Sequence, residues 1–144
     1  MAASSLRPMA KAAGTSDRML VYHYGSKAGV MEAALREIAD RNMAMLDSAL
    51  PAEPVAAERL MAVIGMAMEN GLFDSSVAVF LELAANALRG DALSREIGQA
   101  IAEHYRDWVA ARLNDPARTT ELLIALEGWS VLNAVGLDVP FPTG

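Results

Sequence analysis

Residues 15–27 read TSDRMLVYHYGSK, and this stretch decides how the N-terminal part of the chain is expected to fold. Ser16 is a residue type that caps helices, and it stands just before a short segment of helical character. Gly25 followed by Ser26 is a typical end of one helix and start of the next. Another short helical segment precedes Gly14. The pattern therefore predicts two short helices with a tight joint at Gly14 to Ser16, which is a helix-turn-helix arrangement.

The rest of the chain is also expected to be helical. Apolar positions recur at helical spacing from Lys27 to about Leu50, where PAEP at residues 51–54 interrupts them. Four further helices are predicted: one to Gly71, one from about Asp74 to Gly90, one from about Ala92 to Leu113, and one from Pro116 to about Gly136. The fold class is therefore expected to be all-α, with seven helices.

Composition limits the function classes. The chain has 144 residues, of which 53% are hydrophobic, and it has no cysteine. The absence of cysteine excludes disulfides, thiolate zinc sites and cysteine nucleophiles, and it is compatible with a reducing, cytoplasmic setting. No segment approaches the roughly 18 consecutive apolar residues of a membrane span, so no membrane association is expected. No metal-ligand spacing, phosphate loop or nucleophile elbow occurs, so neither a cofactor nor a metal is expected.

Charge divides the chain into two parts. The formal net charge is −6. Residues 1–27 contain four cations and one carboxylate, a net of +3, whereas residues 28–144 contain eight cations and seventeen carboxylates, a net of −9. A basic region on an otherwise acidic chain is typical of a segment that meets a phosphate backbone.

The stretch LRPMAKAAGTSDRMLVYHYGSKAGVMEAAL resembles the helix-turn-helix of the TetR family of transcriptional regulators. The resemblance covers about residues 6–38 and includes the aromatic-His-aromatic run and the following Gly, Ser and Lys at residues 22–27. It implies a ligand-responsive regulator, most often a repressor that a small molecule releases from double-stranded operator DNA. It also implies a cytoplasmic homodimer.

The resemblance further implies three parts of the chain. Residues 1–27 would be a truncated helix-turn-helix region, residues 28–50 a connecting helix, and residues 51–144 a helical ligand-binding and dimerisation domain. The family has one more helix before the one at Leu6 and commonly another at the C-terminus, so this chain is expected to lack both. Val21 stands where the family usually has a further aromatic residue.

A recognition helix places its N-terminal side chains in the major groove while neighbouring cations and hydroxyls hold phosphates. Arg18 is the expected base reader, since its guanidinium can meet both acceptors of a guanine edge. Asp17 can accept from cytosine or interact with the helix dipole, and Met19 can touch a thymine methyl or face the core. The predicted DNA-binding residues are Arg7, Ser16, Asp17, Arg18, Met19, Tyr22, His23 and Lys27. The alternative is that they form an ordinary solvated surface.

A ligand cavity is expected between facing helices of the C-terminal part, as in other helical bundles. The residues expected to line this cavity are Met61, Met68, Phe80, Asn86, His104, Trp108, Trp129 and Asn133. The helix at residues 116–136 is apolar nearly all round, which indicates either a dimer interface or the centre of the chain's own core. The predicted interface residues are Leu122, Leu126, Trp129 and Ser130.

Two other functions stay open on the sequence alone. The first is a truncated helical ligand-binding or dimerisation module without DNA-binding competence. The second is a small all-α enzyme using Glu82 and His104, although the chain has no recognisable catalytic motif, so no catalytic residues are predicted. A DNA-binding assay separates the regulator from both of these.

Overall fold

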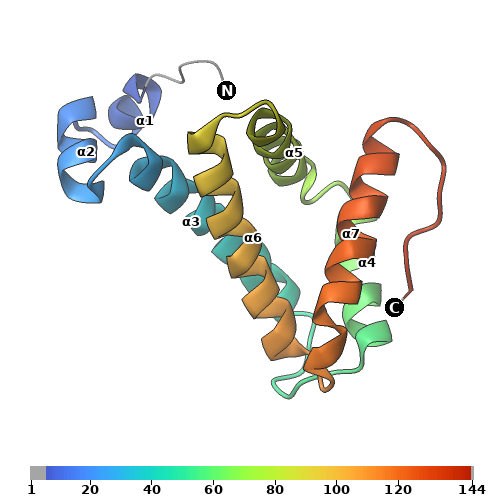
Figure 1. Ribbon diagram of the computed structural model, residues 1–144. Helices are drawn as coiled ribbons and strands as arrows, with labels where there is room; N and C mark the ends of the chain where they lie inside the picture. Colours follow the sequence, from blue (N-terminus) through green and yellow to red (C-terminus); the bar gives the residue numbers. More distant parts are fainter. Residues whose placement is uncertain (1–5, 144) are drawn as a thin grey trace.

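The computed structural model describes residues 6–143, and within them the chain is entirely helical apart from its loops and one isolated β-bridge between Val55 and Leu113 (Figure 1). The predicted all-α fold with seven α-helices is confirmed. In chain order the elements are α1 (Arg7–Ala12), α2 (Asp17–Tyr24), α3 (Lys27–Asp47), α4 (Ala57–Glu69), α5 (Asp74–Leu88), α6 (Ala92–Arg112), the 3-10 helix η1 (Pro116–Arg118) and α7 (Thr119–Ala134).

The two short N-terminal helices meet at the predicted joint. Gly14 adopts φ +66° and Gly25 adopts φ +81°, a backbone region that favours glycine, so each of them ends a helix. The Ser16 hydroxyl accepts a hydrogen bond of 3.2 Å from the backbone N–H three residues later and caps α2. Ser26 caps α3 in the same way at 3.0 Å. Local chemistry therefore sets both boundaries.

Helix α6 packs against both α3 and α5 (Figure 1). The buried apolar side chains form two clusters. The first cluster contains Ala28, Leu83, Ile97 and Ile101, near the start of α3. The second is larger and centres on α4. It contains Leu46, Val55, Ala57, Leu60, Met61, Val63, Ile64, Ala67, Phe73, Val109, Leu113 and Leu122.

The last helix begins later than predicted. Asp115 caps η1 by accepting from the N–H of Ala117 at 3.2 Å, and α7 starts only at Thr119, so the predicted continuous helix from Pro116 is wrong for its first turn. Proline fits the first position of a 3-10 turn as well as that of an α-helix, because a backbone N–H at this position would have no acceptor within the helix.

The chain after α7 turns back over that helix and α4. Trp129 donates from Nε1 to the carbonyl of Val139 at 3.2 Å, and its ring meets the ring of Phe141 edge-on at 5.0 Å between centroids. Phe141 lies directly over Gly65 on α4, where a methyl group would come within 2.7 Å of the ring. The tail therefore covers part of the apolar surface of α7.

No single helix among the described residues is long and apolar enough to cross a membrane. Helices α4 and α5 reach that length and composition only as a pair, and they are bent by 97° at the break between them.

Candidate DNA-binding surface and ligand cavity

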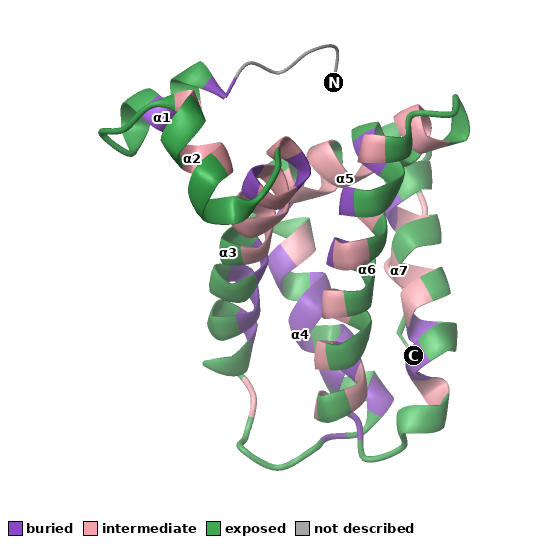
Figure 2. Ribbon diagram, turned by 60° about the vertical axis from the view of Figure 1, so that its left-hand side comes forward, coloured by how far each residue is buried: buried purple, intermediate pink, exposed green. Residues whose placement is uncertain are grey.

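Helix α2 projects from one end of the molecule together with α1, and most of its surface faces solvent (Figure 2). No residue of α2 is buried. Arg18 and His23 are exposed, and Tyr22 exposes 78% of its surface while its ring contacts His23 edge-on. We call Arg18, Met19, Tyr22, His23 and Lys27 the α2 surface. Its side chains are accessible to a large partner.

The remaining predicted DNA-binding residues lie beside this surface. Arg7 is exposed on α1, and Asp17 stands in the first turn of α2, where a carboxylate stabilises the helix dipole. The Ser16 oxygen is engaged in capping. Met19 exposes 43% of its surface, which argues against the alternative that it faces the core. The main neighbours of α2 are α1 and α3, and they leave this side of the helix uncovered.

The cations of the α2 surface, Arg18 and Lys27, form no ion pair within residues 6–143, although the charge of Lys27 helps to lower the pKa of Asp91. Many arginines of the bundle are instead paired with carboxylates. These are Arg36, Arg41, Arg106, Arg112 and Arg118. The α2 surface therefore carries two cations that an external anion can reach, as do the exposed Arg59, Arg89 and Arg95 of the bundle.

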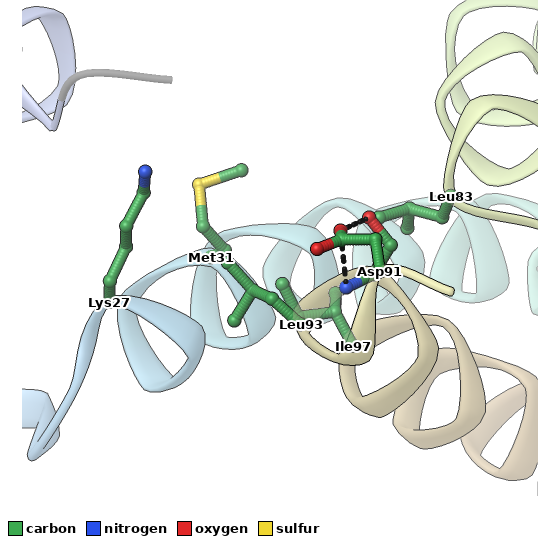
Figure 3. Close-up of a pocket in the computed structure, with 7 residues that line it drawn as sticks. Lys27, Met31, Leu83, Asp91, Leu93 and Ile97 are labelled. Atoms are coloured by element: carbon green, nitrogen blue, oxygen red, sulfur yellow. Dashed lines mark hydrogen bonds between the residues drawn. The ribbon is translucent and has the colours of Figure 1, made fainter. Parts of the chain in front are cut away.

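A small recess of about 20 Å³ joins the start of α3 to the start of α6, and it is lined by Lys27, Met31, Leu83, Asp91, Leu93, Ser94 and Ile97 (Figure 3). Ser94 donates from both its N–H and its hydroxyl to Asp91, and these hydrogen bonds hold the pKa of the Asp91 carboxyl below its usual value. Figure 3 shows the Lys27 ammonium standing apart from that carboxylate. A recess of this size holds about one water molecule, so it is not a ligand site.

A much larger cavity of about 300 Å³ lies within the bundle and is open to solvent. All five long helices, α3 to α7, contribute to its wall. The lining residues are Leu35, Ile38, Ala39, Leu46, Ile64, Met68, Phe73, Ser75, Ser76, Val77, Val79, Phe80, Leu83, Ile101, Ala102, Tyr105, Trp108, Val109, Leu123, Leu126, Glu127 and Ser130. Its volume is at the lower end of the range of sites for small organic molecules, about 300–1,000 Å³.

The cavity wall is mostly apolar and carries few polar groups. The Asn42 amide donates to the Ser76 hydroxyl at 3.0 Å and lies 3.5 Å from the Tyr105 hydroxyl, so it holds both groups in place. Burial raises the pKa of the Tyr105 phenol. Glu127 is the one charged residue of the wall. Glu127 is exposed to solvent where it borders the cavity, and partial desolvation of its carboxyl raises the pKa.

Three of the eight predicted pocket residues, Met68, Phe80 and Trp108, line this cavity. The others lie elsewhere. Met61 is fully buried in the larger core cluster, and His104 is engaged from Nε2 with the Asp40 carboxylate at 2.6 Å. The remaining three are also outside the wall: Asn86 bonds to Arg89, Trp129 packs against the tail, and Asn133 is exposed. Glu82 does not line the cavity either.

The four predicted interface residues of α7 face their own chain. Leu122 is 1% exposed in the core, and Ser130 is buried with its hydroxyl donating to the Leu126 carbonyl at 2.9 Å. Leu126 lines the cavity, and Trp129 packs beneath the tail. The sequence indicated an apolar helix but not its orientation. The apolar residues of α7 that the chain leaves exposed are Ile124, Val131 and Leu132.

Comparisons with protein-family models, with curated proteins and with solved structures found no match.

Proposed function

We propose that the protein is a DNA-binding regulator of the TetR type whose DNA affinity responds to a small molecule in the bundle. The observation that carries the proposal is the α2 surface, where a capped helix presents two exposed rings and two nearby cations that form no ion pair within residues 6–143. A helix of this kind can enter a major groove with Arg18 at base edges and Lys27 at phosphate. The resemblance over residues 6–38 supports the same reading.

Helix α3 supplies a physical route between the two sites. It begins at Lys27, next to α2, and four of its residues, Leu35, Ile38, Ala39 and Leu46, line the cavity. A ligand that binds better to one position of α3 than to another shifts the placement of α2 by that difference in affinity. The same helix therefore belongs to both the DNA-binding surface and the ligand site.

The proposal includes a cytoplasmic homodimer, since twofold operators are read by paired recognition helices. Because the predicted interface residues face inward, the exposed row Ile124, Val131 and Leu132 is the candidate contact surface on α7.

The test is selection of bound duplexes from a random DNA library, followed by affinity measurements on the selected sequence. Arg18→Ala is expected to cost about 1–3 kcal/mol on the selected duplex and little on a scrambled one. Arg59→Ala is the matched control, because Arg59 is an exposed arginine on α4, outside the α2 surface. Equal losses of DNA affinity for Arg18→Ala and Arg59→Ala would refute the role of Arg18. An equal loss of affinity of Arg18→Ala on the selected and the scrambled duplex would refute it as well.

A second candidate is a helical ligand-binding module without DNA-binding competence. The observation in its favour is that α2 buries no residue, so the helix has little packing to fix its docking angle. A chain that binds a ligand in the cavity but enriches no duplex from the library would support this second candidate.

A further inference from the structure

The cavity combines one carboxylate with an aromatic wall. Glu127 is the one charged residue among its lining residues, and Phe73, Phe80, Tyr105 and Trp108 supply four aromatic side chains. The other wall residues are aliphatic except for three serines. Such a wall offers an organic ligand apolar contact over most of its surface and negative charge at one point.

The Glu127 carboxylate has no partner of its own chain. Within residues 6–143 it forms no ion pair and accepts no hydrogen bond. No lysine or arginine lines the cavity. Although Glu127 is exposed to solvent, a carboxylate at the border of an apolar wall attracts a cationic ligand and repels an anionic one.

We propose that this cavity binds an organic cation, an amine or quaternary onium group carrying an apolar body, with the charge beside Glu127 and the body against the aromatic wall. The inference rests on the small-molecule site of the proposed function and names the class of its ligand. Aromatic faces add to the preference, because they attract cations through their ring quadrupoles.

Glu127 borders the same cavity as the helix that connects to α2. Glu127 lies on α7, and α3, which follows α2 in the chain, contributes to the wall of the same cavity. We expect the apolar body of a cation held at Glu127 to contact the α3 residues of this wall. This is the geometry by which a ligand of this class would alter DNA affinity.

The test uses two probes of the same shape and opposite charge, tetraphenylphosphonium and tetraphenylborate, titrated calorimetrically into the full chain without DNA. Because the chain has a formal charge of −6, any cation is favoured to some extent. Glu127→Gln removes one charge from the cavity, and Glu96→Gln removes one charge from an exposed site on α6 outside it. Circular dichroism checks that both variants keep their helix content.

The wild-type chain is expected to bind the phosphonium more tightly than the borate. Glu127→Gln is expected to weaken phosphonium binding about tenfold, and Glu96→Gln to change it less than about twofold. Equal losses for the two variants, or tighter binding of the borate by the wild type, would overturn the proposal. If Glu127→Gln fails to fold, the wild-type comparison is repeated at about 1 M salt, which screens the net charge of the chain, and a preference for the phosphonium that disappears there would overturn the proposal. Because no DNA is present, failure of operator binding does not affect this result.

Discussion

Leu122 and Ile124 lie two residues apart on α7 and test how that helix is oriented. Leu122 is 1% exposed and belongs to the larger core cluster, whereas Ile124 is 69% exposed. Truncation of a buried leucine to alanine costs about 2–5 kcal/mol, because apolar contact is lost and a cavity is left. Truncation of an exposed side chain usually changes stability by less than about 0.5 kcal/mol. We therefore expect Leu122→Ala to be severely destabilising and Ile124→Ala to be nearly neutral in the monomer.

The assay is urea unfolding followed by circular dichroism, repeated over a wide range of protein concentrations. A loss of stability in Leu122→Ala that is the same at every protein concentration supports the place of Leu122 in the chain's own core. A loss at Ile124 that appears only at high concentration supports a contact between subunits through the exposed row of α7. Comparable losses for both variants, or a Leu122 effect that vanishes on dilution, would refute the orientation described above.

Three further outcomes are expected. Gly65→Ala should destabilise the chain, because the new methyl group collides with Phe141. The new methyl group of Gly128→Ala meets nothing within 4 Å, so this variant should stabilise α7 by about 0.5–1 kcal/mol. Thermal unfolding of the two variants tests this difference. Ser16→Ala should weaken α2 by about 1 kcal/mol, which is measured as faster amide exchange in that helix with unchanged exchange in α6. Glu127→Gln should become more stable relative to wild type as the pH rises from below the ordinary pKa of glutamate to neutrality. The reason is that desolvation raises the pKa of Glu127 in the folded state, so its ionisation opposes folding. A stability difference between the two proteins that does not change with pH would contradict this reason.

Elements set by local chemistry were predictable from the sequence. The serines and glycines at the ends of α2 and α3 act within three or four residues of themselves, so Ser16, Gly25 and Ser26 could be assigned without tertiary information. The same holds for the helical periodicity of α3 and α6. The start of α7 was less predictable, since Pro116 suits the first position of either an α-helix or a 3-10 turn.

The cavity residues depend on how helices far apart in sequence face one another, which periodicity does not give. Methionines were natural candidates, yet Met61 fills the core while Met68, about two turns further along the same face of α4, lines the cavity. Glu127 was missed, although a signal was present. It is the one charged residue between Glu121 and Asp138, in a segment otherwise rich in apolar residues, and such an isolated charge marks either solvent or a polar point in a cavity.

The most direct test of the central claim is backbone amide hydrogen exchange along the whole chain, with and without the selected DNA duplex. The proposed function requires slower exchange in residues 16–27 when DNA is bound, because contact with the duplex orders α2 and the start of α3. Helix α4 should keep its exchange rates, since it contributes nothing to the α2 surface. Unchanged exchange in residues 16–27, with protection confined to other helices, would contradict the assignment of α2 as the DNA-binding element.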